Sequence, residues 1–273
     1  MKHATGFDFK DSVDYLVQHH GSAAARMAVH EQAADYAARQ VEDIQREPFT
    51  LPARDDTAWP KVRDYLTRER RLSGERVDQL HERGDVYAER NGQHINAVFV
   101  RRDEEGKETG ASRRGLHNDF KGLARGSDRE RGHFSIDMGD LSRFGSPALV
   151  LVESAIDAMS YADLHPHMTG QIVSTDGNGE PPNKLMKRAL EKLWTIRGAF
   201  DKDMAGDAIW DQIEKVFPTE AIGEGGRHPM RRDTPKEGKD WNEQLQHERD
   251  GKGHEHSGKG HEMGPDVLDM MGR

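Results

Sequence analysis

Hydrophobic and polar positions follow two successive patterns along the 273-residue chain. In residues 6–47 and again in 59–80, apolar side chains recur at helical spacing, which predicts an N-terminal helical segment and then two short helices. Four short apolar runs bounded by turn residues then predict strands, at residues 85–88, 94–100, 109–113 and 134–136. The first half therefore predicts a helical segment over 1–50 and a small α+β domain over 58–140.

The second half of the chain alternates apolar runs with helical patterns. The unmixed apolar runs at 148–152 and 193–200 are typical of strands covered on both faces, and a shorter run at 172–174 lies between them. Helices are predicted after these runs, at 154–162, 184–192 and 206–216, with a last strand at 221–223. We expect an α/β fold over 146–246, Rossmann-like, with a mostly parallel sheet and flanking helices.

Composition limits the remaining possibilities. From residue 247 onward the chain is rich in Gly, His, Lys and Glu, which predicts a disordered tail over 247–273. The chain has no cysteine, which excludes disulfides, thiol catalysis and a cysteine zinc site. No apolar run approaches the ~18 residues of a membrane span, so we expect a cytoplasmic protein without a membrane partner.

The charge of the chain bears on its partners. The formal net charge is −9, which argues against a nonspecific coat for nucleic acid, because such binding depends on Lys and Arg neutralising phosphates. It does not exclude an enzyme that acts on nucleic acid, because the distribution of charge matters more than its sum.

Acidic residues stand directly after two of the predicted strands. Glu153 follows the run at 148–152, and Asp201 and Asp203 follow the run at 193–200. Ligands of open α/β sheets bind at the carboxyl ends of the strands. Carboxylates gathered there repel one another, and a hard divalent cation such as Mg²⁺ relieves the repulsion. The alternative for each acid alone is a solvated strand end or a helix cap.

This arrangement resembles the Toprim domain shared by DnaG-type bacterial primases, topoisomerases and some nucleases. The family pattern is a strand ending in Glu, a Gly-bearing turn and a strand ending in Asp-x-Asp, matched here at 151–153, 172–179 and 200–206. Ser154 stands where the family often has Gly. The resemblance implies that Asp201 and Asp203 hold Mg²⁺ (or Mn²⁺). Glu153 would hold metal or act as the general acid/base, and Asp157 would support the metal site.

Basic residues crowd a Gly-rich stretch before this domain. Glycine lets backbone N–H groups approach phosphates, and arginine binds phosphate oxygens in pairs. The candidate contacts for nucleic acid or nucleotide are Arg113, Arg114, Lys121 and Arg125, with Gly177 and Gly179 in the turn after the middle strand and Lys239 in a Gly-Lys-Asp stretch. Because acidic residues are interleaved with the basic ones, the alternative for the basic stretch is a solvated surface without a ligand. The alternative for the glycine turn is a simple connection between a strand and a helix.

The order of motifs over residues 60–245 is similar to the basic subdomain and Toprim domain of DnaG-type primases, and to small Toprim proteins of plasmids and other mobile elements. The resemblance implies template-directed nucleotidyl transfer, with single-stranded DNA and nucleotides as partners and a helicase, relaxase or zinc-ribbon protein beside them. A Toprim nuclease and a non-catalytic accessory that binds nucleic acid or a partner protein remain alternatives. A topoisomerase is not favoured, because the chain is short and shows no Tyr-bearing strand-passage domain.

Overall fold

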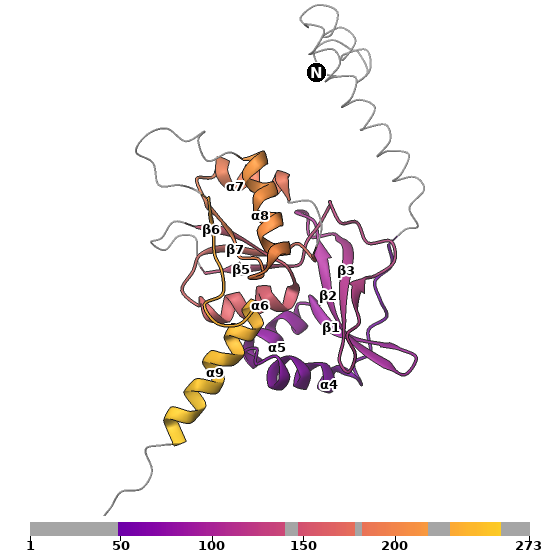
Figure 1. The fold of residues 1–273 in the computed structure, drawn as a ribbon. Helices are drawn as coiled ribbons and strands as arrows, with labels where there is room; N and C mark the ends of the chain where they lie inside the picture. Colours follow the sequence, from indigo (N-terminus) through magenta and orange to yellow (C-terminus); the bar gives the residue numbers. More distant parts are fainter. Residues whose placement is uncertain (1–48, 140–146, 178–181, 218–229, 258–273) are drawn as a thin grey trace, which may run out of the picture. The chain divides into compact units, whose positions relative to one another are not determined.

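Two sheets form the frame of the protein in the computed structural model, which describes residues 49–139, 147–177, 182–217 and 230–257 (Figure 1). Most of the helical segment predicted over 1–50, the strand predicted at 221–223 and Gly179 lie outside these ranges. None of the helices in the described ranges has the length and apolar character needed to cross a bilayer.

The first sheet is an antiparallel meander preceded by helices. Its strands, in spatial order, are β1 (Val86–Asn91), β2 (His94–Arg102), β3 (Glu108–Gly115) and β4 (Lys121–Leu123). The helices before it are α4 (Trp59–Asp64), the π-helical turn η1 (Tyr65–Glu69) and α5 (Gly74–Glu82). The two predicted helices and the first three predicted strands are confirmed, whereas β4 is too short and too polar to be found from an apolar pattern.

The second sheet is mostly parallel, as predicted. Its strands, in spatial order, are β5 (Ser135–Met138), β7 (Gly170–Ser174), β6 (Ala148–Val152), β8 (Thr195–Gly198) and β9 (Met230–Arg232). Only β5 is antiparallel to its neighbour, β7. The strand predicted at 134–136 therefore pairs outside the 58–140 domain to which the sequence assigned it. Ile136 and Met138 are buried in an apolar cluster that the two sheets share, and the pairing of β5 with β7 places this strand in the second sheet.

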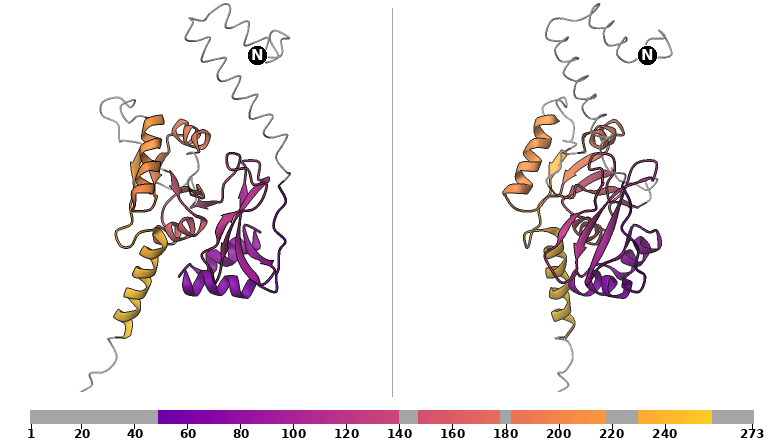
Figure 2. Two further views of the ribbon diagram at one scale, coloured as in Figure 1. Left: turned by 45° about the vertical axis from the view of Figure 1, so that its right-hand side comes forward. Right: turned by 90° about the vertical axis from the view of Figure 1, so that its right-hand side faces the viewer.

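β6 lies at the centre of the second sheet, and its five side chains are at most 1% exposed. Val150 and Val152 pack toward α6 (Ala155–Leu164) on one face. Leu149 and Leu151 pack on the other face against α7 (Asn183–Glu191) and α8 (Met204–Val216). The orange helices of this layer lie apart from α6 in Figure 2. Full burial of such a side chain stabilises the fold by about 1.5–3 kcal/mol. The carboxyl end of β6 is therefore held firmly between two helical layers.

The C-terminal helix α9 (Trp241–Ser257) corrects the prediction of a disordered tail that starts at residue 247. Residues 247–257 are helical. Arg249 forms an ion pair with Asp163 of α6 at 3.1 Å, and Asp250 forms one with Arg71, just after η1, at 2.7 Å. Tertiary contacts thus order a segment whose composition alone predicts disorder.

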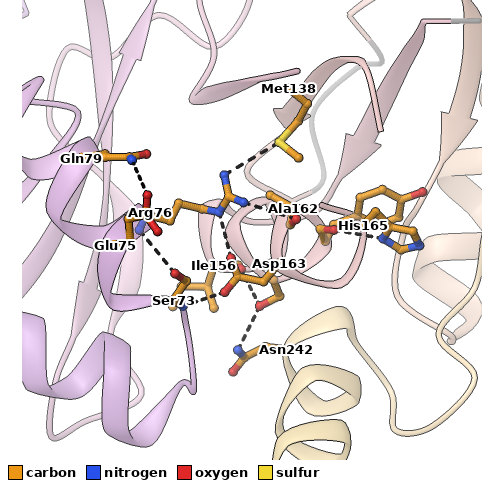
Figure 3. Close-up of polar contacts among 12 residues, drawn as sticks. Ser73, Glu75, Arg76, Gln79, Met138, Ile156, Ala162, Asp163, His165 and Asn242 are labelled. Atoms are coloured by element: carbon orange, nitrogen blue, oxygen red, sulfur yellow. Dashed lines mark hydrogen bonds and ion pairs between the residues drawn. The ribbon is translucent and has the colours of Figure 1, made fainter. Parts of the chain in front are cut away.

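Asp163 joins three helices from different parts of the chain. Its carboxylate, 2% exposed, accepts hydrogen bonds from the Ser73 N–H at 2.6 Å and from Arg76 Nε at 2.8 Å, besides the ion pair with Arg249. Figure 3 shows Arg76 reaching from α5 to Asp163 on α6, with α9 close by. A buried carboxylate is tolerated only with such partners, so these bonds fix the first helices against the second sheet.

We predict that Asp163→Ala lowers the free energy of unfolding by about 3 kcal/mol, because it leaves the partly buried Arg76 guanidinium without its counter-ion. Urea denaturation measures this directly. The matched control is Asp137→Ala, which removes an exposed carboxylate of β5 that accepts one bond from Gln171. Equal, small losses in the two variants would contradict a structural role for Asp163.

Candidate active site

The structure brings the predicted acids together at one edge of the second sheet. Glu153 directly follows β6, and Asp201 and Asp203 lie in the loop from β8 to α8. β6 and β8 are adjacent parallel strands, so their carboxyl ends meet. The Asp201 backbone N–H donates to Glu153 Oε1 at 3.0 Å. The spacing of strands and acids in the sequence was therefore sufficient to locate this cluster.

Helix caps fix the acids locally. Ser154, at the position where the family often has Gly, is the N-cap of α6: its Oγ accepts from the Asp157 N–H at 3.1 Å and donates to Asp157 Oδ2 at 2.6 Å. Asp203 caps α8 by accepting the N–H groups of residues 205 and 206 at 3.0 and 2.9 Å. Gly206 is required at this cap, because a Cβ there would lie 2.2 Å from the Asp201 carbonyl oxygen.

Lys239 places a positive charge among these acids. Its Nζ lies 3.1 Å from Asp203 Oδ2 and 3.9 Å from Asp201 Oδ2. The Lys202 N–H donates to the Lys239 carbonyl oxygen at 2.7 Å, which ties the segment before α9 to the acid loop. The predicted contact between Lys239 and a phosphate stays a prediction, and in this structure the ammonium is paired with the acids.

Two residues at the site were not among the predicted site residues. Asp240 caps the start of α9 by accepting from the Glu243 N–H at 2.8 Å, and its charge also acts on Asp157 and Asp201. Arg232 of β9 donates to the carbonyl oxygens of Phe200 and Asp201 at 2.8 and 2.6 Å and so holds the acid loop. Asp240 carried a sequence signal as a helix cap only, and Arg232 carried none, because a three-residue strand with two arginines gives no apolar pattern that would place β9 in the sheet.

The pKa values of the acids are shifted in opposite directions: burial and mutual repulsion raise three of them, and hydrogen bonds lower the fourth. Burial and the charge of Glu153 raise the pKa of Asp201 to about 7. Burial also raises the pKa of Glu153, against the effect of the Asp201 N–H, and burial and the charge of Asp240 raise the pKa of Asp157. Hydrogen bonds from the Gly206 N–H and Lys239 lower the pKa of Asp203. Near neutral pH the cluster therefore holds protons that a cation would displace.

The donor set fits a divalent cation in part. Asp201 Oδ1 is buried and has no hydrogen-bond partner in the described part of the chain. Among the described residues, no three acidic or histidine side chains converge closely enough to coordinate one ion together. Mg²⁺, however, keeps several waters and is commonly bound through one or two carboxylates. Asp201 with Glu153 or Asp203 would meet that requirement if Lys239 moved, and the predicted supporting role of Asp157, which is bonded to Ser154, stays a prediction.

The predicted basic residues do not share one surface. Arg114 pairs in register with Lys121 across β3 and β4, so these two side chains lie on the same face of the first sheet. Arg113, the preceding residue, faces the other side, where its guanidinium lies 5.4 Å from the ring centre of Phe120. Arg113 also donates to the Leu123 carbonyl oxygen at 3.2 Å. Of these three, Arg114 and Lys121 are therefore placed to act together, and Arg113 is not.

The turn after β7 supports the acid cluster. The Gly177 N–H, in a turn with a φ of 80° at this glycine, donates to the Glu153 carbonyl oxygen at 2.9 Å. Asp176 beside it pairs with Arg101 of β2, whose side chain is 1% exposed. Gly177 thus positions Glu153, and its predicted contact with a phosphate stays untested, as does that of Arg125, an exposed residue after β4.

A hollow of ≈ 390 Å³ opens between η1 and the connection from β3 to β4. Arg70 and Arg114 line it, with Tyr65, Glu69 and His117 among the other lining residues. Arg114 Nε is buried without a hydrogen-bond partner in the described residues. Arg70, which the sequence analysis did not single out, contacts Asn242 Oδ1 at 3.4 Å, two residues beyond Asp240. One short segment of α9 thus connects this pocket to the acid cluster.

We predict that Asp201→Asn stabilises the metal-free protein at pH 8. The pKa of Asp201 is raised on folding, so the native state binds more protons than the unfolded state between about pH 4 and 7, and its stability falls as pH rises through that window. Above it, the neutral amide avoids the repulsion. Thermal unfolding in EDTA at pH 8 is expected to shift upward by about 3 °C, and the difference should disappear at pH 4. A lower unfolding temperature for Asp201→Asn than for the wild-type chain at pH 8 would contradict repulsion among the ionised carboxylates.

Comparisons with known proteins agree with this architecture. Residues 64–140 match the family model described as a protein of unknown function, DUF3991, and residues 150–245 match the model described as Toprim-like. A 65 kDa protein of Zymomonas mobilis subsp. mobilis is 29% identical over 264 residues, which cover 91% of this chain and 41% of that protein. The chain thus spans less than half the length of this relative.

Two solved structures are similar in fold. The primase fragment of the bacteriophage T7 primase-helicase protein has 19% identity and a TM-score of 0.44, over 68% of this chain and 70% of that one. The DnaG primase catalytic domain bound to ssDNA has 18% identity and a TM-score of 0.40, over 77% of this chain and 66% of that one. Toprim domains generally bind divalent metal ions. With its mostly parallel sheet and its acids at the predicted strand ends, the chain carries a Toprim-like domain over residues 150–245.

Proposed function

We propose that this chain is a catalytic core of the DnaG-like primase type, which joins nucleotides on a single-stranded DNA template with Mg²⁺ (or Mn²⁺). The observation that carries the proposal is the convergence of Glu153, Asp201 and Asp203 at the carboxyl ends of β6 and β8 in a Toprim-like domain. The arginine-lined pocket connected to them by the start of α9 supports the same conclusion.

The acids have distinct roles in this proposal. Asp201 and Asp203 would hold the cation, which supplies electrostatic stabilisation of the charge that develops on the phosphoryl oxygens. Glu153 would share in holding it or accept the proton of the attacking hydroxyl, a role that suits a carboxylate whose pKa is raised. Lys239, released from Asp203, would pair with a phosphate oxygen of the nucleotide.

The pocket would bind the phosphates of the incoming nucleotide. Arg70 and Arg114 bring two guanidinium groups to one hollow, and arginine is suited to phosphate because its N–H donors match two oxygens at once. Lys121, on the face of Arg114, adds a further positive charge. Arg113, Arg125, Gly177 and Gly179 stay predicted contacts for nucleic acid. A helicase, relaxase or zinc-ribbon protein would present the template.

A non-catalytic binding protein is the second candidate. Lys239 already neutralises part of the acid cluster, and three side chains able to share one ion do not converge within the described ranges. A chain with these features would bind nucleic acid or a partner protein through its Toprim-like fold and would catalyse no reaction. A nuclease would use the same acids, so only its product distinguishes it.

The direct test is synthesis on single-stranded DNA with labelled ribonucleotides and Mg²⁺ or Mn²⁺. We expect short labelled products from the wild-type chain and at least a ~100-fold loss in Glu153→Gln and Asp201→Asn, because each removes charge needed to hold the cation. Glu214→Gln, an exposed carboxylate on α8, is the matched control and should retain activity. Degradation of the template would identify a nuclease, and bound Mn²⁺ without turnover would favour the binding protein.

The pocket has a separate kinetic signature. Arg114→Ala should raise KM for the ribonucleotide about 10-fold with a smaller change in kcat, because it removes a charged contact with a bound phosphate. Lys107→Ala removes the same charge from an exposed turn and serves as the control. An equal fall of kcat in both variants, with KM unchanged, would refute phosphate binding by Arg114.

A further inference from the structure

The turn that carries Arg70 is irregular and depends on support from outside. η1 (Tyr65–Glu69) is a π-helix, a wide turn that interrupts regular hydrogen bonding, and such turns are frequent at functional sites. It is followed by Arg71, whose φ of 59° is a left-handed conformation that costs a non-glycine residue about 1 kcal/mol or more. A turn of this kind persists only when surrounding groups hold it in place.

α9 supplies that support through its side chains. Asn242 Nδ2 donates to the Arg70 carbonyl oxygen at 2.7 Å, and Gln246 Nε2 donates to the Glu69 carbonyl oxygen at 3.0 Å. Two carbonyl groups at the end of η1 are therefore satisfied by one helix from the other end of the chain.

Both polar atoms of the Asn242 side chain are engaged in this arrangement. Asn242 is buried, with only 3% of its surface exposed. Nδ2 donates to the Arg70 carbonyl oxygen and also to Ser160 Oγ at 3.0 Å, while Oδ1 accepts from Gln246 Nε2 at 3.0 Å and from Arg70 Nη1 at 3.4 Å. Ser160 Oγ in turn donates to the Ile156 carbonyl oxygen of α6 at 2.8 Å, and Figure 3 shows Asn242 reaching from α9 toward this helix. The amide is thus fixed by its own partners and touches Arg70 at two points.

These contacts orient the Arg70 guanidinium. Nε donates to Tyr65 Oη at 2.8 Å, and Nη1 contacts Asn242, so the plane of the group is set from both ends. Arg70 lines the pocket together with Arg114. The guanidinium is thereby held ready for an anion instead of sampling many rotamers, which lowers the entropy lost on binding.

We propose that Asn242 is a positioning residue, which holds the Arg70 guanidinium in the pocket so that it binds a phosphate group of a nucleotide. The inference rests on the proposed function, since it takes the pocket as the phosphate site. It adds that one helix start serves both sites, because Asn242 lies three residues after Lys239 and two after Asp240.

Isothermal titration calorimetry on the full chain tests this with two separate probes: ATP in EDTA for the pocket, and Mn²⁺ alone for the acids. Asn242→Ala should weaken ATP binding about 10-fold, because the Arg70 guanidinium would no longer be oriented toward the phosphate. The Mn²⁺ affinity should change less than about 2-fold. Asn242→Asp should also weaken ATP binding, because a carboxylate lacks the two N–H donors and neutralises Arg70. A merely structural role would lower both affinities together.

Gln244→Ala is the matched control. Gln244 is a buried amide of the same helix whose side chain accepts the Lys236 N–H at 2.8 Å and donates to Glu248 at 3.2 Å, so its loss should leave ATP affinity unchanged. Gln246→Ala, which removes the bonds to Asn242 and Glu69, should weaken ATP binding about 2- to 3-fold and serves if Asn242→Ala does not fold. Thermal unfolding of each variant verifies folding.

The outcomes separate this inference from the proposed function. If wild-type chain binds ATP and Arg70→Ala weakens that binding, but Asn242→Ala and Gln246→Ala leave it unchanged, the positioning role is overturned and the pocket stands. Equal losses of ATP and Mn²⁺ affinity in Asn242→Ala overturn it as well. If wild-type chain does not bind ATP, or Arg70→Ala has no effect, the nucleotide role of the pocket fails and the inference fails with it.

Discussion

Electrostatic repulsion among the acids at the carboxyl ends of β6 and β8 is the constraint on which the rest of the site depends. Two like charges about 4 Å apart repel by roughly 4 kcal/mol at the effective dielectric of a protein surface. The structure offsets this with the Asp201 N–H on Glu153, the helix cap at Asp203, the Lys239 ammonium and retained protons. A divalent cation would replace the Lys239 ammonium and the retained protons. In the metal-free protein these two therefore offset the repulsion that the cation would otherwise offset.

The start of α9 links this cluster to the rest of the molecule. Lys239 and Asp240 face the acids, Trp241 donates to the Ala199 carbonyl oxygen at 2.7 Å, and Asn242 reaches η1. Asp163 then joins α9 to α5 through Arg249 and Arg76. The first helices, the pocket and the acids are therefore held by one set of polar contacts, and a shift of α9 would be felt at both candidate sites.

The sequence predicted what depends on local pattern and missed what depends on tertiary packing. The apolar run at 148–152 and the acids after it were enough for the central strand and for Glu153, because a parallel sheet brings strand ends together. The sheet that β5 joins, the helix beyond residue 246 and the opposite faces of Arg113 and Arg114 follow from pairing and distant ion pairs. Arg70 was not predicted as a site residue, because its contact with Asn242 joins positions some 170 residues apart in the chain.

The most direct test of the central claim is anomalous diffraction from a crystal grown with Mn²⁺ and ATP. The account predicts a metal peak bound to Asp201 together with Glu153 or Asp203, with Lys239 turned away from Asp203 and the triphosphate lying against Arg70 and Arg114. A metal-free acid cluster with Lys239 still paired to Asp203, under Mn²⁺ concentrations that saturate known two-carboxylate sites, would contradict it.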